Sequence, residues 1–151
     1  MKLEKYKLEF NASKTSFEFI SEGPKGSILK RIEYTKVEIK GVKNLYNLGF
    51  GDINIDSIEI DDVVVTDNQD REKVLATVAS TVFIFTKRYP KAKIIMRGRN
   101  TARTRLYRMA INKYFDELSE HFDIKGNFNK QWLPFEKNVD YVAFLISRKI
   151  Y

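Results

Sequence analysis

The sequence has no cysteine and only one histidine among its 151 residues. Without cysteine, the chain has no disulfide, no thiolate ligand for a metal and no cysteine nucleophile. A zinc site built on several histidines is excluded as well, because His121 stands alone. These absences predict a protein of a reducing compartment that holds no metal.

Long hydrophobic runs are also missing. No apolar stretch approaches the ~20 residues that a membrane-spanning helix needs, and residues 1–10 alternate charged and apolar side chains. Such an alternation lacks the apolar core of a signal peptide. We therefore expect a cytoplasmic protein with no membrane partner.

Core-forming residues and positive charge are both plentiful. Hydrophobic residues make up 43% of the chain and aromatic residues 13%, which is enough for a real core in a single domain spanning 1–151. The net charge of +7 favours an anionic partner: nucleic acid, a phosphorylated ligand or an acidic protein. Many lysine-rich proteins carry such a charge and bind nothing anionic, so charge alone assigns no partner.

The first half of the chain has the alternating pattern of strands. Residues 16–21 alternate, residues 23–26 (Gly-Pro-Lys-Gly) predict a turn, and the alternation resumes over residues 28–39. Its phase changes near Thr35, which predicts a β-bulge. Two further strands are expected at residues 45–50 and 58–66.

The period then changes to that of a helix. Apolar residues recur at helical spacing from Asp70 to Tyr89, and Pro90 ends the segment. Asp67, Asn68 and Asp70 precede it as capping side chains. Because most of its circumference is apolar, this helix should be the most buried one and should pack across the sheet.

The second half predicts a strand, a helix and two more strands. The strand covers residues 92–96, the helix runs from Asn100 or Thr101 to about residue 122, and Gly126 and Pro134 punctuate the final pair of strands. The fold class is α+β: a mostly antiparallel sheet with two long helices, in the order β-β-β-β-α-β-α-β-β.

Five of the nine arginines fall within twelve residues at the predicted junction between the late strand and the second helix. The free N–H groups and the dipole of a helix N-terminus attract anions, and arginine adds bidentate donors for phosphate or carboxylate. We therefore predict an anion-binding site here. Its candidate residues are Arg97, Arg99, Asn100, Thr101, Arg103, Arg105 and Tyr107.

Helical phase separates these arginines. At about 100° per residue, Arg103 lies on the apolar arc of the helix, whereas Arg105 and Arg108 lie on the opposite, solvated face. Arg103 should therefore be buried and multiply hydrogen-bonded, either as a strut paired with an acid such as Asp62 or as a contact to a bound anion.

The evidence for other functional sites, a metal site and a surface that stacks on bases, is weaker. Clustered carboxylates can bind hard cations, but the aspartates of this chain lack a calcium-loop order and are expected to cap turns or face solvent. Those aspartates are Asp52, Asp56, Asp61, Asp62, Asp67 and Asp70. Trp132, Phe128 and Phe135 could stack on bases, although strand spacing is more typical of core residues.

Three segments carry a family resemblance: Gly98–Tyr107, with its A-R-T-R-L-Y motif, Trp132–Phe135 and Tyr141–Phe144. The chain resembles a family of small bacterial proteins of unknown function. This resemblance implies no activity and no cofactor.

A second likeness is to the GNAT acetyltransferase fold, in which a late strand leads to a helix that opens N-x-x-A-x-x-x-Y. Asn100 and Tyr107 hold the first and last positions, and Arg103 replaces the alanine. The resemblance would make Tyr107 the proton donor to the thiolate of coenzyme A. However, the family's glycine-rich pyrophosphate loop is replaced by residues 66–71, which are glycine-free and acidic, so acetyl transfer is not expected.

Three functions remain open. The first is a module that binds an anionic partner at the arginine junction. The second is a GNAT-like or other small enzyme that uses Tyr107 and Arg103. The third is the interaction component of a toxin–antitoxin or immunity-like pair, in which positive charge steers an acidic protein.

Overall fold

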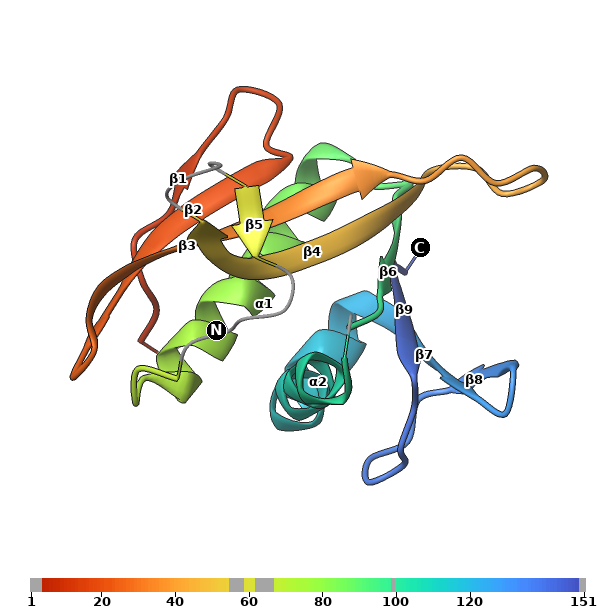
Figure 1. Ribbon diagram of the computed structural model, residues 1–151. Helices are drawn as coiled ribbons and strands as arrows, with labels where there is room; N and C mark the ends of the chain where they lie inside the picture. The colour runs from red at the N-terminus through yellow and green to blue at the C-terminus, as the bar shows by residue number, and fades with distance from the viewer. Residues whose placement is uncertain (1–3, 55–58, 62–66, 99, 150–151) are drawn as a thin grey trace. The chain divides into compact units, whose positions relative to one another are not determined.

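The computed structural model describes residues 4–54, 59–61, 67–98 and 100–149 (Figure 1). The chain forms two compact units, and each is built from two separate stretches of sequence. The first unit comprises residues 1–34 and 49–88, and the second comprises residues 35–48 and 89–151. That the units fold as a single domain stays a prediction.

The first unit contains strands that run β1-β2-β3-β4, with β5 paired to β4. Their bounds are β1 (Glu9–Phe10), β2 (Ser16–Gly23), β3 (Gly26–Lys36), β4 (Leu45–Asn54) and β5 (Glu59–Asp61). The end of β3 and the start of β4 belong to the second unit. β2 and β3 form an antiparallel hairpin whose register closes on Gly23 opposite Gly26. Gly26 has φ +90°, a left-handed backbone that glycine adopts without steric cost.

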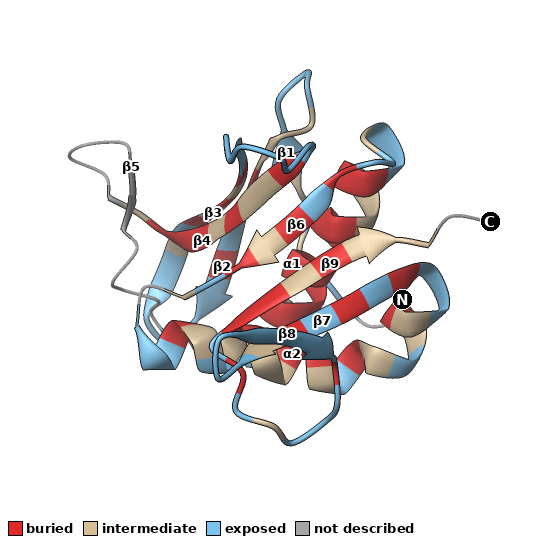
Figure 2. Ribbon diagram, turned by 90° about the vertical axis from the view of Figure 1, so that its right-hand side faces the viewer, coloured by how far each residue is buried: buried red, intermediate tan, exposed pale blue. Residues whose placement is uncertain are grey.

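Helix α1 (Arg71–Arg88) is the more buried of the two helices, as the sequence predicts (Figure 2). Eleven of its 18 residues are buried, against six of 21 in α2. It packs on the sheet through Phe85, whose ring stacks on Tyr34 at 4.0 Å. The Tyr34 hydroxyl also lies 2.8 Å from Thr81 Oγ1. The predicted placement of this helix is confirmed.

A buried ion pair lies in the core of the first unit. Lys30 is 1% exposed, and its Nζ lies 2.5 Å from Asp52 Oδ1. The ammonium also lies 5.9 Å from the centroid of the Phe50 ring. Lys30 stands opposite Phe19 in the β2–β3 register, and both side chains are buried in the core.

The second unit contains α2 (Thr101–His121) and strands in the order β4-β6-β9-β7-β8. The strands other than β4 are β6 (Lys93–Met96), β7 (Phe122–Phe128), β8 (Gln131–Pro134) and β9 (Ala143–Arg148). The β4–β6 pairing is parallel, and the β6–β9, β7–β9 and β7–β8 pairings are antiparallel. Strand β6 leads into α2, which places the predicted junction in this unit.

An aromatic cluster forms part of the core of the second unit. The Phe135 ring lies 5.3 Å from that of Phe115 and 5.4 Å from that of Tyr141. A Cβ at Gly126 would lie 2.3 Å from the Tyr141 ring, so only glycine fits beneath it. Trp132 and Phe128 remain 38% and 40% exposed, and the expectation of core positions holds only for Phe135.

The α+β class and the predicted order of elements are confirmed. The structure adds a short strand, β1, and a third C-terminal strand. The strand predicted over residues 28–39 ends earlier, at Lys36, and an isolated bridge joins Ile39 to Val42. The bulge near Thr35 stays a prediction. Gly126 lies inside β7 rather than at its end. Of the strand predicted at residues 58–66, only residues 59–61 are among those described.

Within the described part of the chain, no helix is both long and apolar enough to cross a membrane.

Candidate anion-binding site

The predicted junction forms around the N-terminus of α2. Asn100 is the N-cap: its side chain accepts a hydrogen bond from Arg103 N at 2.8 Å, and its carbonyl oxygen accepts one from Thr104 N at 3.1 Å. The first turn of α2 contains no acidic residue. The positive end of the helix dipole is therefore not neutralised by a carboxylate of the helix itself.

Gly98 brings the end of β6 against the first turn of α2. A Cβ at this position would lie 2.3 Å from Thr104 N and 2.8 Å from the carbonyl carbon of Arg103. Both are backbone atoms, so no flexible side chain could move aside. The close approach requires glycine, and it fixes how the strand enters the helix.

The candidate residues divide into an exposed and a buried group. Four are exposed: Arg97, Asn100, Thr101 and Arg105. Two are buried, Arg103 at 4% and Tyr107 at 3% exposure, and Arg99 lies outside the described residues. Neither Arg97 nor Arg105 forms an ion pair with a described acid. By contrast, Arg108, predicted to be solvated, is half-buried and ion-paired with Asp140.

Arg103 is buried, as its helical phase predicts. It was also predicted to be multiply hydrogen-bonded, yet its Nε and Nη2 atoms are buried without a hydrogen bond to a described residue. Arg103 has at least one further interaction. Asp62, the predicted partner, lies outside the described residues.

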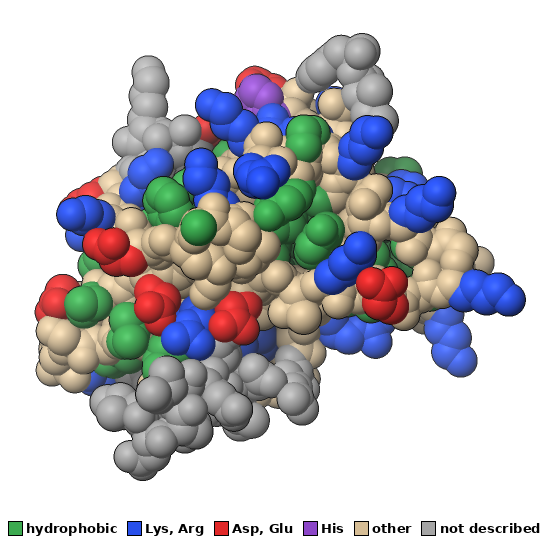
Figure 3. Space-filling view, turned by 90° about the horizontal axis from the view of Figure 1, so that it is seen from above, with side chains coloured by type: hydrophobic (Ala, Val, Ile, Leu, Met, Phe, Trp, Pro, Cys, Tyr) green, Lys and Arg blue, Asp and Glu red, His purple; other side chains and the backbone are tan. Residues whose placement is uncertain are grey.

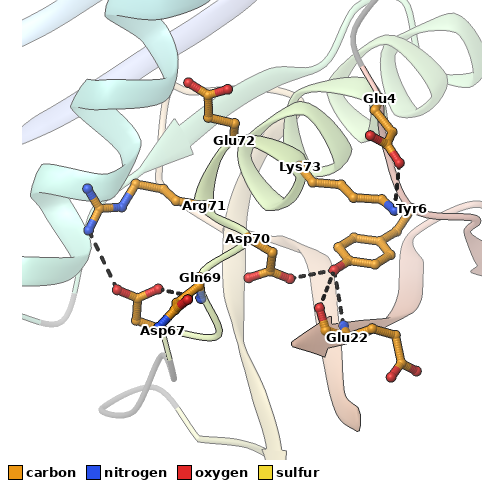
Figure 4. A pocket seen from close by; sticks show the side chains of 9 residues that line it. All are labelled: Glu4, Tyr6, Glu22, Asp67, Gln69, Asp70, Arg71, Glu72 and Lys73. Atoms are coloured by element: carbon orange, nitrogen blue, oxygen red, sulfur yellow. Dashed lines mark hydrogen bonds and ion pairs between the residues drawn. The ribbon is translucent and has the colours of Figure 1, made fainter. Parts of the chain in front are cut away.

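The N-terminus of α1 is the electrostatic opposite of that of α2. It borders a cavity of about 900 Å3, shown in Figure 4. Five of the nine lining residues are acidic and two are basic. The lining residues are Glu4, Tyr6, Glu22, Asp67, Gln69, Asp70, Arg71, Glu72 and Lys73. Such a cavity repels phosphate, which agrees with the acidic character of residues 66–71 in the sequence.

Tyr6 organises this cavity (Figure 4). Its hydroxyl donates a hydrogen bond to Asp70 Oδ2 at 2.6 Å, and Ser21 Oγ donates to the same oxygen at 2.5 Å. Its ring stacks on Phe19 at 5.4 Å and lies 4.3 Å below the Lys73 ammonium. The N-terminal segment is thus fixed to α1 and β2 at one side chain.

The capping residues predicted before α1 have other roles. The Asn68 side chain is 1% exposed and holds the β2–β3 turn, by accepting from Lys25 N at 2.7 Å and donating to Gly26 O at 2.9 Å. Asp70 binds Tyr6, and Asp67 accepts from Gln69 N. The sequence indicated polar side chains before a helix but not these distant partners.

Burial and the hydrogen bond to Asp70 raise the pKa of the Tyr6 hydroxyl above its usual value. The protonated form therefore stabilises the fold below about pH 10, and this contribution is lost as the pH rises through the raised pKa. Tyr6→Phe should lower the free energy of unfolding by about 1 kcal/mol at neutral pH. The difference from wild type should narrow above about pH 10, as measured by urea unfolding at several pH values. A difference that stays constant to pH 11 would contradict this role.

Metal binding receives no support from the acidic residues that are described. No three or more histidine, aspartate or glutamate side chains among them gather as a possible metal site. Asp52 contacts Lys30 and Asp67 lies 3.9 Å from Arg71. Asp56 and Asp62 lie outside the described residues, and the side chain of Asp61 is not described.

These features define an α+β protein whose second unit carries an arginine-flanked helix N-terminus. A family of unknown function (DUF6934) matches residues 2–149, and the chain belongs to that family. The resemblance to a family of unknown function is thus confirmed. No curated protein and no solved structure matches the chain.

Proposed function

We propose that the protein binds an anionic partner, nucleic acid or a phosphorylated ligand, at the junction of β6 and α2. The observation that carries the proposal is the pair of exposed arginines, Arg97 and Arg105, on either side of an acid-free helix N-terminus. Exposed guanidinium groups offer bidentate hydrogen bonds to phosphate, and the first amides of α2 add donors that point along the helix axis.

The comparison between the two helices supports this assignment. Both begin after a loop, but α1 begins beside carboxylates of Asp67, Asp70 and Glu72, whereas α2 has none in its first turn. An anion that seeks a helix N-terminus would therefore be repelled at α1 and attracted at α2. Asn100 already caps α2, so the helix can form without a bound anion.

Acetyl transfer is a weaker candidate. The loop before α1, where the GNAT likeness would place pyrophosphate, carries Asp67 and Asp70. Tyr107, the expected proton donor, is only 3% exposed, although a general acid must reach the reacting atom. We therefore favour binding over catalysis, in a protein of the bacterial cytoplasm, where nucleic acid and phosphorylated metabolites are abundant.

The double variant Arg97→Ala/Arg105→Ala should weaken binding to nucleic acid and reduce its salt dependence. Each phosphate contact contributes about 0.9 to the slope of log K against log salt on duplex DNA, so the loss of two contacts should lower the slope by about two. The measurement is fluorescence anisotropy with labelled DNA and RNA oligonucleotides. Lys7→Ala/Lys87→Ala is the control, because it removes the same charge at exposed positions of the first unit.

A small ligand is tested in parallel with inorganic phosphate. Amide resonances at the start of α2 should shift on titration in the wild type and not in the double variant. If no oligonucleotide binds at tens of micromolar protein, where even non-specific binders engage, nucleic acid is excluded. If phosphate also leaves the amides unchanged, the junction is not an anion site, and the acidic-protein hypothesis replaces it.

A further inference from the structure

A second basic surface lies at the other end of β6. Residues 37–44 link β3 to β4 and, together with Lys36 at the end of β3, form what we call the lysine hairpin, which extends past the two strands (Figure 1). Val42 N donates to Ile39 O at 3.0 Å, and Val37 N donates to Leu45 O at 2.8 Å. Gly41, with φ +84°, forms the tip. The segment is therefore a formed hairpin, although all of its residues except Val37 are exposed.

Five exposed lysines gather on and beside this hairpin. Three belong to it: Lys36, Lys40 and Lys43. Lys91 and Lys93 lie at its base, because Lys93 N donates to Asn44 O at 2.8 Å and stands opposite Leu45 in the β4–β6 register. Figure 3 shows one face of the molecule, on which lysine and arginine side chains are interspersed with hydrophobic and acidic ones.

Few acids oppose this charge. The single acid of the hairpin is Glu38, whose side chain is 85% exposed and lies 3.9 Å from Lys36 Nζ. Asp123 stands opposite Ser147, which in turn stands opposite Lys93, so it is the nearest acid in the adjoining strands. Arg148 follows Ser147 directly, and its positive charge offsets the negative charge of Asp123. This end of the unit remains strongly positive.

Two aliphatic side chains stand between the lysines. Ile39 is 51% exposed and Val42 is 38% exposed, at positions joined by the isolated bridge of the hairpin. An apolar tip flanked by cations fits a partner that offers both phosphates and apolar edges. Duplex DNA offers both, since its major groove admits a two-stranded β-ribbon and displays thymine methyl groups between two rows of phosphates.

We propose that the lysine hairpin is a binding surface for double-stranded DNA, with lysines on the phosphates and Ile39 and Val42 against base edges in the major groove. Single strands are recognised by stacking on exposed aromatic rings, but Tyr46 and Tyr89 at the hairpin base are half-buried and 6.1 Å apart. Duplex RNA has a major groove that is too deep and narrow for side chains to read.

This surface goes beyond the arginine junction, which follows the C-terminal end of β6, whereas the hairpin meets its N-terminal end. The two can therefore be mutated separately. Lys40→Ala/Lys43→Ala should raise the Kd for a 20-base-pair DNA duplex on the order of tenfold and lower the salt slope by about two. Ile39→Ser/Val42→Ser should raise the Kd without changing the slope, because no phosphate contact is lost.

The control Lys7→Ala/Lys87→Ala should change the Kd less than twofold, and thermal unfolding of each variant checks that it folds. Equal weakening by the control would overturn the proposal, as would tighter binding to single-stranded DNA, duplex RNA or phosphatidylserine vesicles. No duplex binding at tens of micromolar protein would also overturn it. If duplex binding fails only in Arg97→Ala/Arg105→Ala, the hairpin proposal is wrong and the arginine junction stands. If the hairpin variants alone lose duplex binding and phosphate leaves the α2 amides unchanged, the arginine-junction proposal is wrong and the lysine hairpin stands.

Discussion

Asp52→Ala should lower the free energy of unfolding by about 3–5 kcal/mol, because it leaves the ammonium of Lys30 buried without its carboxylate. Lys30 is 1% exposed and the Asp52 side chain 12% exposed, with 2.5 Å between Nζ and Oδ1. The Phe50 ring, 5.9 Å away, offers an attraction much smaller than the desolvation cost. Urea unfolding followed by circular dichroism, with unchanged m, measures the loss.

The apolar replacement of both partners is the informative control. Lys30→Met/Asp52→Leu removes both charges while keeping most of the volume, so it should recover most of the stability that Asp52→Ala loses. Should the double variant be as unstable as the single one, the ion pair itself contributes net stability. Should Asp52→Ala unfold like wild type, Lys30 must reach solvent or another acid, and the buried-pair description is wrong.

The fold was largely predictable because periodicity reports which face of an element is buried. The alternation of Phe17 and Phe19 predicted β2, and the apolar circumference of residues 70–89 predicted the burial of α1, including Phe85. Helix phase likewise predicted that Arg103 lies inside. Each of these properties depends on neighbours within a few residues along the chain.

Contacts between distant segments were not predictable in the same way. Lys30 interrupts an alternating strand, and a charged residue there suggests solvent unless its partner is known to stand on β4. Tyr6 meets Asp70 64 residues away and Thr77 71 residues away, and nothing near Tyr6 in the sequence signals these contacts. The exposure of Trp132 also depends on its place in β8, the last strand of the sheet order.

The arginine junction contains one feature that the sequence could predict and one that it could not. The cap at Asn100 was predictable, because its side chain binds the backbone N–H of Arg103, only three residues further along the chain. The need for glycine at Gly98 was not, since it arises from the approach of two backbones that only the folded chain brings together. Helix phase separated the buried Arg103 from the exposed Arg105, but it placed Arg108 in solvent, where the structure has it half-buried and paired with Asp140.

If Arg103 is a strut, Arg103→Ala should lower the free energy of unfolding by about 3 kcal/mol, since it leaves the partner of a buried side chain unpaired and opens a cavity in the core. Arg103 is 4% exposed and Tyr107 is 3% exposed. Arg103→Met keeps most of the aliphatic stem, so the difference between the two variants separates packing from charge. Arg105→Ala is the matched control on the exposed face of α2 and should change stability by less than about 0.5 kcal/mol.

The same variants decide whether Arg103 is a strut or a ligand contact. Binding of phosphate to the folded protein raises its unfolding free energy by mass action. If Arg103 contacts the anion, the stabilisation by inorganic phosphate should disappear in Arg103→Met, whereas for a strut it should persist while the baseline stability falls. Sodium chloride at equal ionic strength controls for screening. A loss below about 0.5 kcal/mol in Arg103→Ala would contradict the strut, because removing a strut leaves its partner groups buried and unpaired.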